Sequence, residues 1–443
     1  MISRRTAGWI AAASGGRLVS GDPDQPAPKR AAIDSREIEP GDLFVGLRGQ
    51  VDGGQFAAAA LEAGAWGALV DPAHAAPLSG GDRPVIQAED PLAALQNLAR
   101  GWRREVGARV VGLTGSTGKT STKDLLAALL RGAGLETHAN RENLNTEIGL
   151  PLTILEADEG VEAMVLEMAM RGAGQIAELT AIAEPDVGLI VNVGPVHLEL
   201  LGTIEAVAAA KAELIHDLRP GAACVVPAAE PLLEPHLRDD IETITFGEGG
   251  EVRLESFENG VARIDARGTQ IELELSYSEP HNLSNTVAAT AAAIALGVTP
   301  SGRVDVRFSS LRGQVVELGG GVTVVNDCYN ANPMSMRAAL DHLAATPAER
   351  RIALLGTMAE LGPDGERYHR DIGRRAAELG VDVLITVGEE AVRFGDEFDG
   401  EEHAVATPEE ARAILEELAM PGDRVLIKGS RSVGLERVVG ASK

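Results

Sequence analysis

Cysteine and aromatic residues are scarce in this sequence of 443 residues. The two cysteines, Cys224 and Cys328, cannot form a disulfide framework, and their spacing matches no zinc site. Aromatic residues make up 3% of the chain and hydrophobic residues 44%, so alanine, valine, leucine and isoleucine must build the packed interiors. The chain is too long for one core, and about two to four domains are expected.

The sequence also lacks a net positive charge and long apolar runs. The formal net charge is −26, which argues against a nonspecific nucleic-acid-binding protein because a polyphosphate would be repelled away from any local basic patch. No run approaches the roughly 18 apolar residues of a spanning helix. Residues 11–16 are too short and too weakly apolar for a signal sequence. We therefore expect no nucleic-acid partner, no membrane insertion, and a soluble, cytoplasmic protein. The expected oligomeric state is a monomer, although no feature of the sequence determines it.

A glycine-rich loop between a strand and a helix is the strongest local signal. Residues 109–114 form a β-branched run, and a leucine-rich helix follows the loop and ends near Gly132. Glycines let consecutive N–H groups face one ligand, and the helix start adds unpaired N–H groups and the positive end of its dipole. The pattern G-x-x-x-x-G-K-[ST] is not strict here, because its first glycine would fall on Leu113.

An ordinary strand-to-helix turn is the alternative, but Gly-Lys-Thr in this setting favours a nucleoside triphosphate site. Lys119 can reach the terminal phosphates, and the Thr120 hydroxyl can hold Mg²⁺. The predicted site consists of Thr114, Gly115, Ser116, Thr117, Gly118, Lys119 and Thr120.

Alternation of short strands and helices predicts an α/β protein with three domains. The first, residues 1–105, is a small α/β unit with strands at 31–33, 42–45, 67–70 and 84–86 and helices at 57–63 and 91–102. Polar residues 103–105 and then Gly107 are expected to form a linker.

The second predicted domain, residues 106–312, has strands that are apolar on both faces, as a central parallel sheet requires. An antiparallel hairpin is expected at 252–277 around Asn259-Gly260, followed by a helix at 282–296. The third, residues 313–443, is expected to be a doubly wound unit with strands at 322–325, 352–355, 383–387 and 425–427 and helices at 333–343 and 408–418.

Polar residues at two strand ends are candidates for the chemistry. Glu167 and Asn192 end strands of the central domain, and ligands gather at the carboxyl ends of such strands. Glu167 is either a Mg²⁺ carboxylate or a solvated strand-end residue. His197 is either a functional or an ordinary packed imidazole, and Lys211 is either functional or a solvated charge on a helix.

The motifs in this order resemble those of the Mur ligases, the ATP-dependent amide-forming enzymes of peptidoglycan precursor synthesis. The resemblance extends over nearly the whole chain, and the segment 327–333 resembles the member that adds D-alanyl-D-alanine. The matching segments are 114–120, 143–151, 192–197, 210–213, 281–285, 327–333, 356–362 and 428–431.

The resemblance implies a central P-loop ATPase-like domain between an N-terminal UDP-sugar domain and a C-terminal Rossmann-like lid that binds the dipeptide. The carboxylate of UDP-N-acetylmuramoyl-tripeptide would attack the γ-phosphate of ATP, and the amine of D-alanyl-D-alanine would displace phosphate.

The resemblance also implies roles for single residues. Lys119 would bind ATP, Thr120 and Glu167 would bind one Mg²⁺, and His197 and a carbamylated Lys211 would bind a second. Asn282 and Asn285 would lie near adenine, with Arg312, Asp327 and Tyr329 near ribose and phosphates. The implied substrate-binding residues are Ser35, Arg36, Asp52, Asn145, Thr146, Asn330, Asn332, Lys428 and Arg431.

The sequence departs from the family pattern at a few positions. Gly54 stands where a histidine often follows Asp-Gly, Leu311 where a glycine usually precedes Arg312, and Asn326 where an acid is frequent; Pro227 and Ala228 replace an Asn-Asp pair. The competing interpretations are a ligase on the same scaffold that adds glutamate to folate or a diamino acid to the muramyl peptide, a non-ligating nucleotide switch, and an inactive relative.

Overall fold

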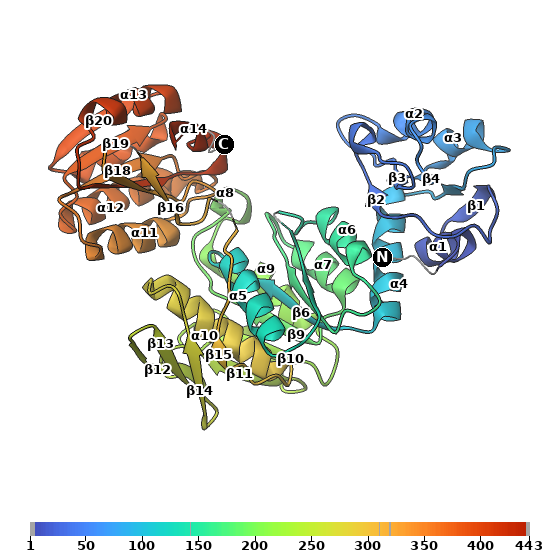
Figure 1. The fold of residues 1–443 in the computed structure, drawn as a ribbon, viewed down its shortest axis with the longest axis horizontal. Helices are drawn as coiled ribbons and strands as arrows, with labels where there is room; N and C mark the ends of the chain where they lie inside the picture. Colours follow the sequence, from blue (N-terminus) through green and yellow to red (C-terminus); the bar gives the residue numbers. More distant parts are fainter. Residues whose placement is uncertain (1–4, 142, 310, 319, 440–443) are drawn as a thin grey trace.

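Three β-sheets with flanking helices make up the computed structural model, which describes residues 5–141, 143–309, 311–318 and 320–439. Figure 1 shows the three units along the longest axis, with the first unit (blue) at one end and the third (orange to red) at the other. The predicted α/β class with three units is confirmed. No helix in these described ranges is long and apolar enough to span a membrane.

The first unit is a five-stranded sheet in the order β1-β5-β4-β3-β2. Strands β2 to β5 are parallel neighbours and β1 is antiparallel to β5. The strands are β1 (Arg17–Ser20), β2 (Ala31–Ala32), β3 (Leu43–Val45), β4 (Gly67–Val70) and β5 (Val85–Gln87), and the helices include α1 (Ala7–Ser14), α2 (Ala57–Glu62) and α3 (Pro72–Ala75). Neither α1 nor β1 was predicted from the sequence.

Helix α4 (Pro91–Val106) runs through the predicted linker and ends at Gly107, whose φ is 67°. The linker prediction is therefore wrong. The Arg103 side chain is buried: its Nε donates to the carbonyl of Ala183 at 2.9 Å, and its guanidinium lies 3.2 Å from Asp186. Because one apolar core continues from the first unit into the central one, α4 joins them as a packed helix (Figure 1).

The central sheet has ten strands, and its parallel part carries the phosphate loop. That part has the order β11-β10-β9-β6-β8-β7, and β8 is buried along its whole length, as the prediction of apolar faces requires. Its strands are β6 (Arg109–Thr114), β7 (Thr137–Ala139), β8 (Ala163–Glu167), β9 (Val187–Ile190), β10 (Ala223–Pro227) and β11 (Glu242–Phe246). The helices around it are α5 (Lys119–Gly132), α6 (Gly149–Glu156), α7 (Gln175–Ala183), α8 (Leu198–Leu201), α9 (Ile204–His216) and α10 (Pro280–Ala295).

The predicted hairpin is a three-stranded antiparallel extension of this same sheet. It comprises β12 (Val252–Glu258), β13 (Val261–Ala266) and β14 (Thr269–Glu274), with β15 (Gly302–Arg303) at its edge. Asn259 and Gly260 form the first turn with positive φ angles of 51° and 79°, as the sequence indicated. Helix α10 covers these strands and packs beside α5 (Figure 1).

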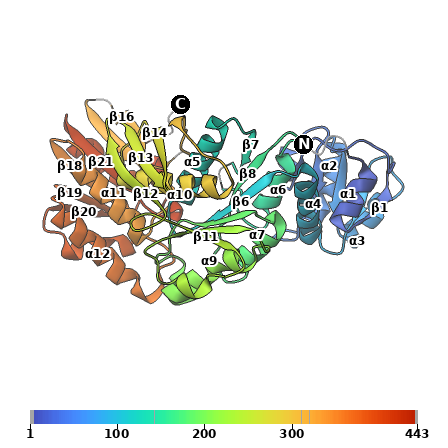
Figure 2. The same cartoon turned by 90° about the horizontal axis from the view of Figure 1, so that it is seen from below.

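The third unit is a six-stranded sheet in the order β16-β17-β21-β18-β19-β20, parallel except for β16. Asn332 caps α11 in a capping box with Ser335, which explains why this helix begins at Pro333. Figure 2 shows this unit against the central unit, on the side opposite to the first. The elements are β16 (Gln314–Leu318), β17 (Val322–Asn326), β18 (Arg350–Gly356), β19 (Val383–Val387), β20 (Glu401–Val405) and β21 (Asp423–Lys428), with α11 (Pro333–Ala345), α12 (Gly365–Glu378), α13 (Pro408–Leu418) and α14 (Glu436–Val439).

Candidate active site

The phosphate loop lies between the end of β6 at Thr114 and the start of α5 at Lys119. Gly118 precedes the helix with a φ of 75°, and no side chain caps the helix start. A Cβ at this position would lie 2.7 Å from Oδ1 of Asn285, so both backbone angle and space require glycine. The helix amides are therefore available to an anion at the predicted place.

Asn192 braces this loop from the end of β9. Its Oδ1 accepts hydrogen bonds from the backbone N–H groups of Ser116 (3.1 Å) and Thr117 (3.0 Å), and its Nδ2 donates to the Thr117 carbonyl at 3.1 Å. The Ser116 hydroxyl is also held by the backbone of Gly194. The side chain of Asn192 and the backbone of Gly194 thus set the shape of the loop, a bracing role that the sequence did not reveal.

Lys119 lies half-buried on the wall of the site, and its Nζ donates to the carbonyl of Gly115 at 2.9 Å. Desolvation lowers the pKa of its ammonium, while the negative charge of Glu167 opposes that shift. A bound triphosphate would add further negative charge beside this ammonium.

Glu167 ends β8 and is buried with one oxygen unsatisfied. Its Oε1 accepts a hydrogen bond from Nδ2 of Asn145 at 2.8 Å, but its Oε2 has no hydrogen-bond partner among the described residues. A buried carboxylate oxygen without a donor is destabilising unless a cation or ligand engages it. Thr120, in the first turn of α5, is also buried, and these two residues fit the donor set of a Mg²⁺ site.

Lys211 on α9 is buried, with 2% of its surface exposed. No carboxylate in the described part of the chain forms an ion pair with it. Burial lowers the pKa of its ammonium well below the usual value, and the positive charge of Lys119 adds to the effect. This shift favours the neutral amine, which is the form that reacts with CO₂.

His197 precedes α8 with a left-handed backbone, at a φ of 54°. Its Nδ1 shares a short hydrogen bond with Glu360 of the third unit. Partial burial lowers the pKa of its imidazole, although Glu360 opposes the shift, and the charges of Lys119 and Lys211 lower it further. The charge of Lys119 thus interacts electrostatically with Glu167, His197 and Lys211.

A cavity of about 460 Å³ extends from the phosphate loop to the third unit. The sequence-predicted residues that line it are Ser116, Thr117, Gly118, Lys119, Thr120, Asn282, Asn285, Arg312, Asp327, Tyr329, Asn330, Asn332 and Lys428. Tyr277 and His342 also line the cavity, and neither belongs to one of the sequence motifs. The sequence marks Tyr277 only as an aromatic residue shortly before a helix that begins with proline.

The third unit contributes a connected set of polar groups to this cavity. Lys428 is buried, lies 2.5 Å from Oδ2 of Asp327 and donates to the Asn330 carbonyl at 3.1 Å. Nδ2 of Asn332 donates to the carbonyl of Ser116 at 3.3 Å, so the third unit touches the phosphate loop itself. The guanidinium of Arg312 lies over the Tyr329 ring, 4.3 Å from its centroid.

Other predicted residues lie outside the cavity. The Thr146 hydroxyl accepts a 3.5 Å hydrogen bond from Gly149 at the start of α6, and Arg431 pairs with Glu436 at 3.3 Å on the third unit. Leu311 has a φ of 60°, an angle at which glycine would be unstrained, so this departure from the family pattern places strain next to Arg312.

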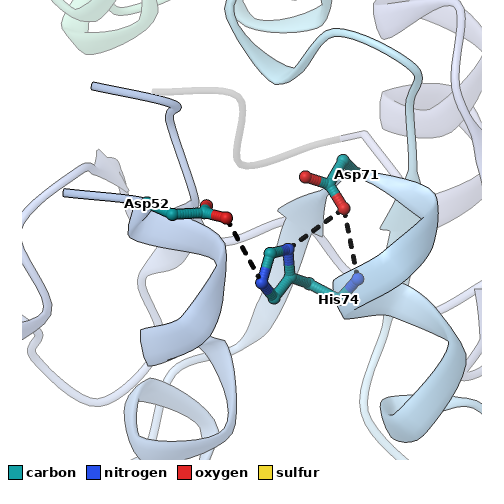
Figure 3. Close-up of side chains that lie close together, drawn as sticks. All are labelled: Asp52, Asp71 and His74. Atoms are coloured by element: carbon teal, nitrogen blue, oxygen red, sulfur yellow. Dashed lines mark hydrogen bonds and ion pairs between the residues drawn. The ribbon is translucent and has the colours of Figure 1, made fainter. Parts of the chain in front are cut away.

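The first unit gathers its candidate residues at the carboxyl edge of its sheet. Ser35 and Arg36 follow β2, and the Arg36 guanidinium, 2.5 Å from Asp34, lowers the pKa of that carboxyl to about 2. Figure 3 shows the His74 imidazole between the carboxylates of Asp71 and Asp52. The distances are 3.0 Å from Nδ1 to Asp71 and 3.6 Å from Nε2 to Asp52.

His74 accounts for Gly54. A Cβ at residue 54 would lie 2.4 Å from Nδ1 of His74, because the ring occupies the space where a side chain would start. Asp52, Asp71 and His74 are the one cluster of three potential metal ligands found among the described residues. Asp71 already accepts from Arg48 and from the backbone of α3, so its oxygens are engaged by protein donors.

Comparisons with known proteins bear on this site. Residues 30–103, 113–293 and 311–431 match the profiles described as "Mur ligase family, catalytic domain", "Mur ligase middle domain" and "Mur ligase, glutamate ligase domain". The chain is 38% identical to the UDP-N-acetylmuramoyl-tripeptide--D-alanyl-D-alanine ligase of Synechocystis sp., covering 92% of this chain and 90% of the relative. It is 32% identical to the ligase of that name from Bacillus subtilis, with 98% of both chains covered.

Solved structures show the same similarity over the whole fold. MurF from Acinetobacter baumannii superposes with a TM-score of 0.87 at 28% identity, covering 99% of this chain and 98% of that one. The MurF ligase from Thermotoga maritima in complex with ADP has a TM-score of 0.81 at 32% identity, with 93% and 96% covered.

Proposed function

Because the chain belongs to the Mur ligase family, we propose that it couples ATP hydrolysis to amide formation, adding D-alanyl-D-alanine to UDP-N-acetylmuramoyl-tripeptide. The curated relatives that carry this name are 32% and 38% identical over nearly the full length. The observation that carries the proposal is the cavity that joins a phosphate loop to the third unit. It leaves room for a nucleotide beside a unit that can supply a second substrate.

The proposed reaction has two steps. A carboxylate oxygen of the tripeptide attacks the γ-phosphorus of ATP, and the bond to the ADP oxygen breaks, which leaves an acyl phosphate. The amine nitrogen of D-alanyl-D-alanine then attacks the acyl carbon, loses a proton and displaces phosphate. Lys119 and the loop amides hold the transferring phosphates, so positioning and charge neutralisation carry the catalysis. Asn282 and Asn285 contact adenine, and Arg312, Asp327 and Tyr329 contact ribose and phosphates.

We propose that Thr120 and Glu167 hold one Mg²⁺ and that His197 and Lys211 hold a second. Both ions would neutralise phosphate charge. The support is the unsatisfied Oε2 of Glu167 and the donor set around Lys119. Lys211 joins this set as a carbamate: its neutral amine adds to CO₂, forming a nitrogen–carbon bond and releasing one proton. The anionic oxygens that result are ligands that Mg²⁺ accepts, whereas an ammonium is not.

The remaining substrate contacts are proposed from the sequence. Ser35, Arg36 and Asp52 bind the uridine diphosphate portion, since a guanidinium can make paired bonds to a diphosphate. Asn145 and Thr146 lie beside the tripeptide, and the dipeptide is received by the third unit through Asn330, Asn332, Lys428 and Arg431. We further propose that the protein works as a monomer in the cytoplasm, where ATP is available.

A panel of acceptors tests the proposal. The purified protein is incubated with ATP, Mg²⁺ and UDP-N-acetylmuramoyl-tripeptide ending in lysine or in diaminopimelate. D-alanyl-D-alanine, glutamate or a diamino acid is added, and the products are identified by mass spectrometry. We expect amide product with the dipeptide alone. Product with another acceptor would indicate a different ligase of this family, and ATP hydrolysis without any amide would indicate a nucleotide switch.

A further inference from the structure

A contact between the central and third units ends on one of the candidate metal ligands. Glu360 lies in the loop between β18 and the short helix η5 (Gly362–Asp364). Its Oε2 shares a short hydrogen bond with Nδ1 of His197, and its Oε1 lies 3.2 Å from the guanidinium of Arg171. Since His197 and Arg171 both belong to the central unit, one carboxylate of the third unit holds two side chains of its neighbour.

The backbone of the same loop docks onto the first turn of α8. The Glu360 carbonyl accepts a hydrogen bond from the N–H of Glu199 at 3.2 Å. Glu360 has a φ of 64°, which non-glycine residues rarely adopt, and Gly362 approaches so closely that a Cβ there would lie 3.2 Å from the Glu199 nitrogen. The loop therefore has the particular shape that places the Glu360 carboxylate against His197.

The carboxylate determines which imidazole nitrogen of His197 is free. A carboxylate accepts hydrogen bonds and does not donate them, so the hydrogen of a neutral imidazole must sit on Nδ1. The lone pair is then on Nε2, which is the atom left to bind a metal ion. Without Glu360, neither the tautomer nor the ring orientation would be held by this contact.

We propose that Glu360 is a positioning residue that presents Nε2 of His197 to Mg²⁺, so that the metal site is completed only when the third unit is docked. This inference rests on the proposed function, in which the third unit receives the dipeptide. It means that the unit carrying the acceptor amine also prepares the metal site in the central unit. The phosphates would then be fully neutralised only in the arrangement that can use the acyl phosphate.

Binding of Mn²⁺, used as a probe for Mg²⁺, tests the inference without catalysis. Free Mn²⁺ is measured by electron paramagnetic resonance in the presence of ADP for the wild type, Glu360→Ala and Glu366→Ala. Glu366 is an exposed glutamate of the same unit, paired with Arg370 at 3.2 Å, and serves as the matched control. We expect Mn²⁺ affinity to fall about tenfold or more in Glu360→Ala, the range for losing an outer-shell partner of a ligand, and to stay unchanged in Glu366→Ala.

Equal Mn²⁺ affinity in Glu360→Ala and the wild type would overturn the inference. A failure of the proposed function would look different, because the wild type would then give no amide product with D-alanyl-D-alanine in the acceptor panel, whatever its Mn²⁺ affinity. Glu360→Gln keeps an oxygen that accepts from Nδ1–H, so we expect it to restore most of the affinity.

The tautomer of His197 separates positioning from simple docking. In ¹⁵N NMR spectra of metal-free protein, with the signal assigned by its loss in His197→Gln, the wild type should show Nδ1 protonated and Glu360→Ala a mixture of both tautomers. Arg171→Ala loses the ion pair with Glu360 but retains the contact with His197, so its tautomer and Mn²⁺ affinity should match the wild type. If Arg171→Ala lost as much Mn²⁺ affinity as Glu360→Ala with its tautomer unchanged, unit docking would carry the effect and the proposal would be wrong.

Discussion

Charged groups are paired differently in two regions of the molecule. One region is the cleft between the central and third units, and the other is the carboxyl edge of the first sheet. In the central unit, which forms one side of this cleft, an oxygen of Glu167 has no hydrogen-bond partner and Lys211 has no carboxylate partner among the described residues, although both side chains are buried. At the edge of the first sheet, Arg36 is 87% exposed and pairs with Asp34, while Arg48 is 61% exposed and pairs with Asp71.

The difference indicates what each region does. Buried polar groups without partners are destabilising, so they persist where a ligand or a reaction uses them. Exposed ion pairs contribute little to stability and can exchange partners with a ligand at small cost. We therefore assign the chemistry to the cleft and recognition to the edge, and we expect substitutions in the cleft to have the larger effects on turnover.

Lys119→Ala should produce the largest effect. We expect turnover to fall by about 10³-fold or more, because the ammonium at the transferring phosphates is lost. Thermal unfolding followed by circular dichroism should stay close to the wild type, and the exposed Lys29→Ala should leave both activity and stability unchanged. Substantial turnover in Lys119→Ala would contradict the phosphate assignment.

Lys211→Ala should produce the next largest effect on turnover. We expect about a 10²-fold loss in turnover, comparable with removal of one charge-stabilising group, and partial recovery with formate, which can replace a carbamate oxygen. Burial lowers the pKa of the Lys211 ammonium well below its usual value, which favours the neutral amine that adds CO₂. Wild-type protein in ¹³C-bicarbonate should give a carbamate NMR signal that Lys211→Ala lacks. If active protein showed only the unmodified amine of Lys211, the carbamate would be ruled out.

Arg36→Ala tests the recognition edge and should have a smaller effect that is confined to one substrate. We expect the KM for UDP-N-acetylmuramoyl-tripeptide to rise about tenfold, since one charge-assisted contact to the diphosphate is lost. The kcat and the KM for ATP should not change. Arg17→Ala, an exposed arginine of the same unit bonded to Gln87, is the control. A fall in kcat without a change in this KM would break the distinction between the two regions.

Gly54→Ala should affect stability rather than turnover. The added Cβ would displace the His74 ring, which Asp71 and Asp52 hold, so we expect a destabilisation of about 1–3 kcal/mol in urea unfolding. Combining it with His74→Ala should recover the packing part of that loss. If Gly54→Ala and the wild type unfolded at the same urea concentration, the His74 ring would move aside without a cost in stability, which would contradict this prediction.

Local patterns predicted much of the fold, and long-range contacts account for what was missed. The strand at 383–387 and the helix at 408–418 have the predicted bounds because their apolar spacing and proline or threonine starts are local features. The linker at 103–105 was wrong because charged residues there look solvated in sequence, whereas Arg103 bonds to residues about 80 positions away.

The candidate site shows the same limit. The phosphate loop, Glu167 and Lys211 lie in segments with recognisable spacing, and the cavity gathers most of the predicted nucleotide-binding residues. The brace from Asn192, the contact of Glu360 with His197 and the ring of His74 over Gly54 all join residues that are distant in sequence. No spacing rule in a single sequence reports such pairs.

Transfer of labelled oxygen tests the central claim most directly. The terminal carboxylate of UDP-N-acetylmuramoyl-tripeptide is labelled with ¹⁸O, the complete reaction is run with ATP and D-alanyl-D-alanine, and the released phosphate is weighed by mass spectrometry. If the cleft activates the acid as an acyl phosphate, each phosphate released with an amide carries one ¹⁸O atom from the carboxylate. Unlabelled phosphate accompanying amide product would contradict the account.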